Sequence, residues 1–423
     1  MSKRKLILSV LINGVLLSSL YVAGAVDVAP GSGNGVAIGT GSNAPKAENV
    51  AIGKGATIAY SGGVGQPSTG DIVIGGKAHI NNYIDQGGGI AIGANSFVEN
   101  MVGGMERAFD FNQAGYKNFL GIPHGLPKNP EKMVTGMAIG QNTYARSGSI
   151  MLGTHNYKGK LGDVDVDSSN TKNNNGHLFS TTIGANSYSN GLFSSIVGAY
   201  SIASSGYPTT SADATKNFGA TITGSLNSIE SASASSQYSG VANSIVGTAN
   251  RTFNSNGSLV FGAGNEITNS VTSISAPSSG GNSAKELSEK LRSAVKNSNG
   301  GGSTMAFGSG NKADYTLRSA LMGVNNTLTG SQGNESTNTM LTGFHNTADK
   351  VFNTTVIGSE NTVTNSKNGL VMGDNREVKD ANHTVLIGST DSKTTTSVNN
   401  AVAVGHNTNV TVEGGVALGS NRS

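Results

Sequence analysis

The segment Val36-Ala37-Ile38-Gly39 recurs almost unchanged as Val50-Ala51-Ile52-Gly53 and as Ile90-Ala91-Ile92-Gly93. The shared pattern is an apolar residue, any residue, a second apolar residue and a glycine. Between Gly308 and Gly419 the successive glycine spacings are 15, 20, 15, 15, 15, 17 and 14 residues, which is typical of a repeat fold. Counted loosely, the motif occurs nineteen times, with its glycine at positions 39, 53, 75, 93, 140, 153, 184, 198, 224, 247, 262, 308, 323, 343, 358, 373, 388, 405 and 419.

Each repeat has the pattern of a short strand followed by a corner. Residues i and i+2 of a strand point to one face, and a glycine accepts the backbone conformation that a sharp bend needs. We therefore predict structural turns at Gly39, Gly53, Gly93, Gly140, Gly308, Gly323, Gly358, Gly373, Gly388, Gly405 and Gly419. A repeat of about fourteen residues is long enough for two short strands and two turns, which make one narrow coil of a parallel β-solenoid.

Eight repeats also carry an asparagine three residues after the glycine. Asparagine tolerates the left-handed backbone conformation better than most residues do, so we interpret these positions as a second tight turn. They are Asn156, Asn227, Asn250, Asn265, Asn311, Asn326, Asn346 and Asn361.

The stacked coils predict an all-β rod with a thin core. Coils about 4.8 Å apart make nineteen repeats about 90 Å long. Ala, Val and Ile fill such a core, and an apolar face is left over, so lateral association between chains is expected. The register is least certain around 195–250, because Ser195-Ile196-Val197-Gly198 and Thr221-Ile222-Thr223-Gly224 place their largest residue in the middle.

Composition excludes several other classes of protein. Glycine accounts for 61 of 423 residues, far below the one third of collagen, and only 8 residues are proline. The chain has no cysteine, which excludes a disulfide scaffold and a thiolate metal or redox site. Charged residues make up only 13% of the chain.

Residues 1–25 have the pattern of a secretory signal peptide. Lys3, Arg4 and Lys5 precede the apolar run 6–22, and Ala23-Gly24-Ala25 resembles a cleavage site. The run is interrupted by polar residues, which argues against a membrane-spanning helix. Cleavage removes three of 28 basic residues and none of 25 acidic ones, so the mature chain 26–423 carries 25 of each. A neutral chain is a poor partner for nucleic acid.

Three stretches, at about 94–136, 154–180 and 263–304, are too long for one coil and are predicted as insertions. The first contains Phe109, Phe111, Tyr116 and Phe119, four of the 23 aromatic residues of the chain. Aromatic residues dominate interface hot spots, so these four are candidate receptor-binding residues. Alternatively, they form a small local core or pack against a neighbouring chain.

The third insertion, 263–304, contains a predicted helix over 285–295, with Leu287, Leu291 and Val295 on one face and Ser283 as a possible N-cap. That face either packs on the roll or meets a partner.

The second insertion, 154–180, carries Asp163, Asp165 and Asp167, but the glycine and glutamate of a calcium-binding EF-hand are missing from their positions. Solvated turn acids are the simpler interpretation, and we predict no metal site.

The sequence offers little support for catalysis. The seven histidines lack a zinc-binding spacing, and the chain has no Gly-x-Ser-x-Gly turn between a strand and a helix pattern. The glycine run at 300–302 lacks the Lys-Ser/Thr of a phosphate-binding loop. We therefore predict a protein without enzymatic activity and without a cofactor.

The repeats from Val36-Ala37-Ile38-Gly39 to Val416-Ala417-Leu418-Gly419, behind a signal peptide, resemble the YadA-like head of trimeric autotransporter adhesins. The resemblance covers most of residues 31–423. It implies a left-handed parallel β-roll, a parallel homotrimer and display on the outer membrane of a diderm bacterium. It also implies binding to host-cell receptors or to extracellular matrix. The interrupted roll further resembles a CEACAM-binding member of the family, so a CEACAM-family receptor is one expectation.

Members of that family continue into a neck, a coiled-coil stalk and a membrane-embedded β-barrel anchor. Here the sequence ends at Ser423, after a segment that resembles the last coil before a neck, so we expect that the sequence is truncated and that membrane attachment uses an anchor outside it. Two alternative functions stay open. One is an exported β-helix enzyme acting on polysaccharides, which needs clustered carboxylates. The other is a structural surface fibre.

Overall fold

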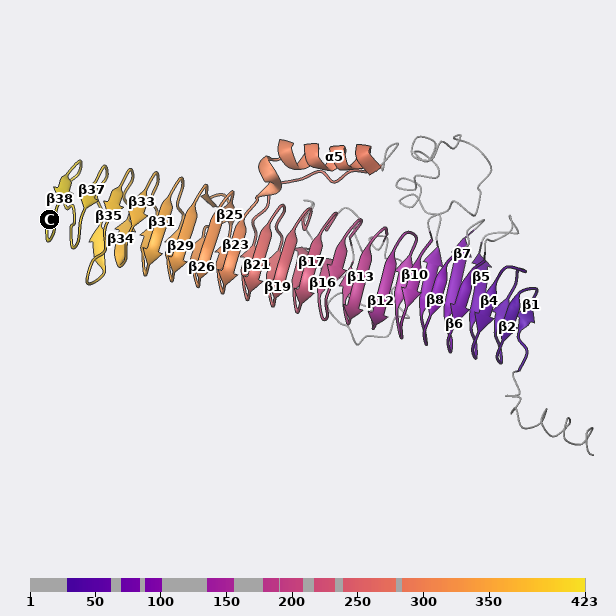
Figure 1. Cartoon of the computed structure of the whole chain (residues 1–423). Helices are drawn as coiled ribbons and strands as arrows, with labels where there is room; N and C mark the ends of the chain where they lie inside the picture. Colours follow the sequence, from indigo (N-terminus) through magenta and orange to yellow (C-terminus); the bar gives the residue numbers. More distant parts are fainter. Residues whose placement is uncertain are drawn as a thin grey trace, which may run out of the picture.

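The protein is a long rod of stacked coils, with the N-terminal coils at one end and the C-terminal coils at the other (Figure 1). The computed structural model describes residues 29–61, 70–83, 88–100, 135–155, 178–189, 191–207, 217–232, 239–278 and 284–422. Nearly all regular structure in these ranges is parallel β-strand, which confirms the prediction of an all-β parallel roll.

Within the described ranges, one wall of the rod is a sheet of nineteen parallel strands, one for each repeat. The pairings run in a single line from β2 to β38, so this sheet is open at both ends. The strands are β2 (Val36–Ile38), β4 (Val50–Ile52), β6 (Ile72–Ile74), β8 (Ile90–Ile92), β10 (Met137–Ile139), β12 (Ile150–Thr154), β13 (Thr181–Ala185), β15 (Ser195–Val197), β17 (Thr221–Ser225), β19 (Ser244–Thr248), β21 (Leu259–Ala263), β23 (Met305–Ser309), β26 (Ala320–Val324), β29 (Met340–Phe344), β31 (Thr355–Ser359), β33 (Leu370–Met372), β35 (Val385–Ile387), β37 (Val402–Val404) and β38 (Val416–Leu418).

The second wall consists of two parallel sheets placed end to end. The first has the strands β1 (Ser32–Gly33), β3 (Asn43–Ala44), β5 (Thr57–Ser61), β7 (His79–Tyr83), β9 (Phe97–Asn100) and β11 (Tyr144–Arg146). The second has β14 (Tyr188–Ser189), β16 (Ile202–Tyr207), β18 (Ser228–Ala232), β20 (Arg251–Phe253), β22 (Glu266–Thr268), β24 (Lys312–Asp314), β27 (Thr327–Thr329), β30 (Thr347–Asp349), β32 (Thr362–Thr364), β34 (Arg376–Lys379) and β36 (Thr394–Thr396). A separate two-stranded sheet, made of β25 (Thr316–Leu317) and β28 (Ser336–Thr337), lies on a third side of the rod.

The core lies between the two walls and is filled by the middle residue of each first-wall strand. Ala51, Ile196 and Leu341 are fully buried, whereas the residues on either side of them are not. The middle position therefore points inward, and residues i and i+2 share the outer face. Ile196 pairs with Ile222, and Ile222 with Ile245, so large middle residues do not shift the first-wall register in 195–250. The second wall does have a register shift in this range, between Ser205 and Tyr207 of β16.

The corner glycines are needed for both their backbone angle and their small size. All eleven glycines singled out above as turns have φ between 112° and 142°. Strands of successive coils also approach closely at this corner. A Cβ on Gly343 would lie 2.0 Å from the carbonyl oxygen of Gly358 in the next coil, so no larger residue fits there.

The interpretation of the asparagines as left-handed turn residues is wrong. In the described coils the left-handed residue is the one before each asparagine, for example Asn325 (φ 53°) and His345 (φ 52°). The asparagines themselves, such as Asn326 and Asn346, are buried. Their side chains turn inward because the corner leaves backbone carbonyl groups of the next coil without strand partners, and an amide can bond them.

The predicted helix is present as α5 (Ala284–Asn297), followed by the short 3-10 helix η3 (Asn299–Gly301). It lies along the rod at its third side (Figure 1). Leu287 is buried, and Leu291 and Val295 pack against the same apolar cluster, which includes Phe218. The apolar face of the helix therefore packs on the roll. The expected N-cap, Ser283, lies outside the described residues.

The described parts of the expected insertions belong partly to the roll. Residues 97–100 form strand β9, and residues 266–268 form strand β22, each paired in register with its neighbours. The first expected insertion therefore begins no earlier than residue 101.

Candidate functional site

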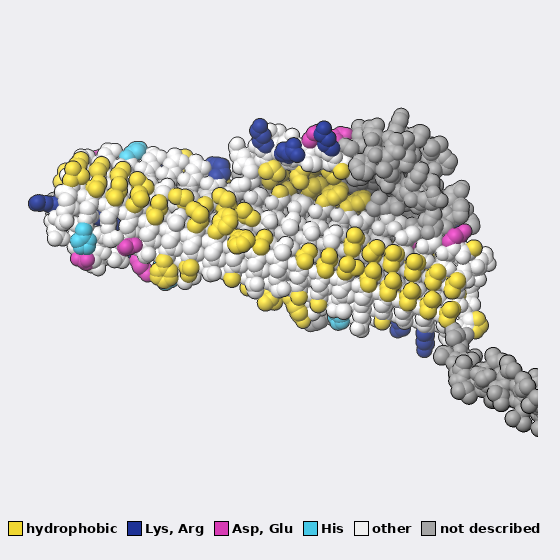
Figure 2. Space-filling view, in the orientation of Figure 1, with side chains coloured by type: hydrophobic (Ala, Val, Ile, Leu, Met, Phe, Trp, Pro, Cys, Tyr) yellow, Lys and Arg dark blue, Asp and Glu magenta, His cyan; other side chains and the backbone are white. Residues whose placement is uncertain are grey.

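The main surface feature is an apolar strip along the first wall. It consists of the first and third residues of the triplet that precedes each corner glycine, from Val36 and Ile38 in β2 to Val416 and Leu418 in β38. These side chains point away from the core because the middle residue points into it. Val36 is 49% exposed and Val416 is 64% exposed. Figure 2 shows hydrophobic side chains in rows along the rod.

The first-position column of the strip is interrupted by hydroxyl groups near the middle of the rod, whereas Ile183 and Val197 continue the third-position column. The first position holds Thr181, Ser195, Thr221 and Ser244 in four successive coils. These residues pair with one another in register, so they form a continuous polar gap.

Two bulky residues lie beside this gap. Tyr200 follows β15 and Leu226 follows β17, each at the corner position where the residue has a positive φ. Their side chains are 54% and 59% exposed. Their φ angles of 52° and 60° are unfavourable for large side chains, and strained residues of this kind are often found at functional surfaces. In the coils of β15 and β17, the first position of the strip is polar, and an exposed apolar side chain lies beside the strip instead.

A ladder of buried amides runs inside the corner of the C-terminal coils. In each step the side-chain nitrogen of one asparagine donates to the oxygen of the preceding asparagine and to the glycine carbonyl of the next coil. For Asn326 these distances are 3.1 Å to Asn311 and 2.9 Å to Gly343. The members are Asn227, Asn250, Asn265, Asn311, Asn326, Asn346 and Asn361.

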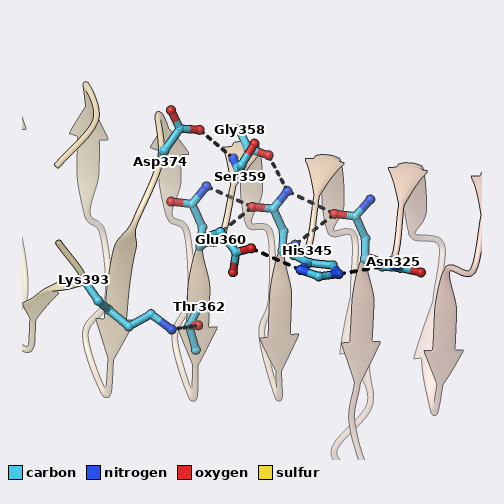
Figure 3. A network of polar contacts seen from close by, with 11 residues as sticks. Asn325, His345, Gly358, Ser359, Glu360, Thr362, Asp374 and Lys393 are labelled. Carbon is cyan, nitrogen blue, oxygen red and sulfur yellow. Dashed lines mark hydrogen bonds and ion pairs between the residues drawn. The ribbon is translucent and has the colours of Figure 1, made fainter. Parts of the chain in front are cut away.

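Figure 3 shows the exposed contacts around this ladder. His345 Nδ1 lies 3.1 Å from Glu360 Oε1, and its Nε2 lies 3.2 Å from the amide nitrogen of Asn325. The backbone amide of Ser359 donates to Asp374 at 2.8 Å. The corner is thus bonded across coils on both its inner and its outer side.

The ladder ends at a buried arginine, Arg376, which occupies the next asparagine position. Its backbone amide donates to the Asn361 side chain at 2.9 Å. Its guanidinium donates to the carbonyl oxygens of Gly388 (2.7 Å), Gly405 (3.2 Å) and Thr408. Burial lowers the pKa of Arg376. Arg376 lies three residues after Gly373, as the ladder asparagines do after their glycines, so this spacing could have predicted its place in the ladder. A charged residue at that position is not expected to be buried.

The N-terminal coils have a different polar network, at the opposite corner. It is centred on Asp71, which is fully buried. Asp71 accepts hydrogen bonds from the Tyr60 hydroxyl (2.7 Å), the Asn82 amide (2.9 Å) and the backbone of Gly89 (3.0 Å). Asn100 continues the network from Asn82, at 2.9 Å. Both carboxylate oxygens of Asp71 therefore have hydrogen-bond donors in the core.

A second buried group of ionisable residues lies at β9 and β11. The Tyr144 hydroxyl donates to Glu99 at 2.5 Å, and Arg146 is buried nearby. Burial and the Glu99 charge raise the pKa of Tyr144 well above its ordinary value. Burial also raises the pKa of Tyr188. Both phenols are therefore neutral in the folded protein at ordinary pH.

The candidate receptor-binding residues Phe109, Phe111, Tyr116 and Phe119 lie outside the described residues, as do Asp163, Asp165 and Asp167. Among the residues that the structure describes, no group of three or more His, Asp or Glu side chains could hold a metal ion. In the same ranges, no helix is long and apolar enough to cross a membrane.

The polar gap, the burial of Arg376 and the Asp71 network were not predicted, since none of them belongs to a recognised motif. No protein-family model and no curated protein matches this chain.

Proposed function

We propose that residues 26–423 form the head of a bacterial surface adhesin that has no catalytic activity. In this proposal the protein is exported and displayed on the outer membrane of a diderm bacterium, where parallel homotrimers of left-handed β-rolls bind host-cell receptors or extracellular matrix. The observation that carries the proposal is the apolar strip, which follows the whole rod on one outer face.

The size of the strip supports association between copies. Nineteen strands about 4.8 Å apart make it about 86 Å long, and two outward side chains make it about 10 Å wide. The resulting area of about 860 Å² is close to the roughly 800 Å² that each partner buries in a standard interface. A second and third copy present the same strip along the same length, so they are the occupants that fit it over its whole length.

The first test is the mass of the purified mature chain in light scattering. We expect three times the chain mass. The double substitution Ile74→Asp and Ile183→Asp places carboxylates in the strip and should give a monomer, because a buried unpaired charge is costly. Val412→Asp is the matched control, since Val412 is exposed outside the strip. A native monomer would contradict the trimer, and open-ended assemblies would favour a structural fibre.

The second test concerns the receptor. We propose that the aromatic residues of the first insertion bind it, and that a CEACAM-family ectodomain is one candidate. Deletion of 101–134, with a short linker from Asn100 to Thr135, keeps strands β9 and β10. Binding to CEACAM ectodomains and matrix proteins should be lost, whereas deletion of 156–177 should leave it unchanged. Equal binding by both deletions would remove the insertion from the proposal.

The same preparation tests the enzyme alternative. Release of sugars from pectin-like polysaccharides by the native protein would contradict a non-catalytic adhesin.

A further inference from the structure

Outside the polar gap, the apolar strip is so repetitive that it determines the axial alignment of two copies only weakly. Ile52, Ile74 and Ile92 occupy the third position of three successive coils. If one copy slides by one coil, about 4.8 Å, isoleucine again meets isoleucine and little free energy is lost. A well-defined assembly therefore needs a feature that differs from coil to coil.

Two phenylalanines provide such a feature. Phe261 and Phe307 occupy the third position of the adjacent strands β21 and β23 and are paired in register. Their rings are stacked, with centroids 6.4 Å apart, and Phe261 is 54% exposed. Every other outward position of the strip holds an aliphatic, Met, Ala, Ser or Thr residue. The neighbours of the pair along the rod are Val246 and Met322.

We infer that Phe261 and Phe307 act as a steric key that sets the axial register between copies of this chain. The inference rests on the proposed trimer and adds what aligns it. In the aligned assembly, the Phe261 and Phe307 rings of each copy meet the same rings of its neighbours. After a slide of one coil, a phenyl ring meets a Val246 or Met322 side chain, so one contact is overfilled and another is left with a void.

The absence of cysteine in the sequence makes disulfide trapping a direct test. Leu370→Cys and Val385→Cys are introduced in two differently tagged copies, which are co-expressed. These positions pair on adjacent coils, so a disulfide between the unlike positions reports a slide of one coil. Met372→Cys with Ile387→Cys repeats the test in the third-position column.

With both phenylalanines present, we expect disulfides between like positions only. With Phe261→Val and Phe307→Val, disulfides between unlike positions should rise to a share comparable with that of like positions. Phe352→Val is the control, because Phe352 is exposed away from the strip, and it should keep the native pattern.

Light scattering of every variant separates the two possible failures. A native monomer, or a trimer without disulfides at like positions in either column, contradicts the proposed strip interface. A trimeric valine variant that keeps only disulfides between like positions overturns the key alone. If the valine variant does not assemble, the double substitution Phe261→Met and Phe307→Met replaces it, because methionine matches the size of the neighbouring Met322 side chain. The same share of disulfides between unlike positions is then measured. Failure of this variant to assemble would mean that the rings supply affinity and not register.

Discussion

The two halves of the rod share one backbone plan but satisfy their buried polar groups in different ways. In the C-terminal coils, the third residue after the corner glycine is an asparagine that bonds to the coils on both sides. In the N-terminal coils, the same position holds small residues. The side-chain hydroxyls of Ser96 and Thr143 donate to the glycine carbonyl of their own coil, at 2.9 and 3.0 Å. There, buried side-chain bonds between coils are made by the Asp71 network at the opposite corner and by Tyr144 with Glu99.

The stacking of coils therefore does not depend on one set of side chains. Backbone pairing and the buried middle residues are common to both halves. The polar side chains only have to satisfy the carbonyl and amide groups left at the corners, and neutral amides or one carboxylate with several donors both do so. The predictions below concern local opening free energies, because repeat proteins need not unfold as one unit.

The largest effect is expected at Arg376, the end of the C-terminal ladder. Arg376→Ala leaves the carbonyl groups of Gly388, Gly405 and Thr408 without this donor, so opening of the last coils should become easier by about 4 kcal/mol. Amide hydrogen exchange in 385–419 measures it. Arg376→Asn continues the ladder and should recover part of the loss. Equal losses for both variants would show that the volume of the side chain matters, and not its bonds.

A substitution inside the ladder should cost somewhat less. Asn326→Ala removes three donated bonds and the acceptor for the backbone and side-chain amides of Asn346, so we expect a loss of about 3 kcal/mol. Ser96→Ala at the equivalent N-terminal position removes one bond and should cost about 1 kcal/mol. Hydrogen exchange in the coils on either side of each residue gives both values. Similar costs in the two halves would remove the contrast between them.

The N-terminal network is tested by Asp71→Asn. An amide can accept fewer of the hydrogen bonds from Tyr60, Asn82 and Gly89, and its own donor group meets donors, so we expect a loss of about 2 kcal/mol. Exchange in 72–92 should rise while exchange in 340–372 stays unchanged. Propagation of the effect to the C-terminal coils would contradict local stabilisation.

The smallest effect is a pH dependence confined to the N-terminal half. Because the pKa of Tyr144 in the folded protein is raised above the unfolded value of 10.0, the unfolded chain loses this proton first as the pH rises. Stability is therefore retained below about pH 10 and falls above it, by at most about 1.4 kcal/mol per pH unit for one proton. Tyr144→Phe should remove this part of the slope in urea unfolding between about pH 9 and pH 11. An unchanged slope would assign it to other groups.

Much of the fold could be predicted from the sequence, because a glycine at regular spacing marks every corner and an apolar triplet marks most first-wall strands. The helix over 285–295 was equally clear from its apolar spacing. The role of the asparagines was predicted wrongly, since asparagine suits both a left-handed turn and a buried amide ladder. Arg376 and Asp71 were not identified, because an isolated charged residue gives no signal that it will be buried.

The number of coils, their corners and the strand type follow from the sequence alone, since these depend on backbone freedom and on periodicity over a few residues. Which face of each strand is inside depends on tertiary packing. Both faces are apolar, and the choice depends on which side chains fit between two walls. The docking of α5 and the burial of Arg376 were decided in the same way, because each depends on groups from coils far apart in the chain.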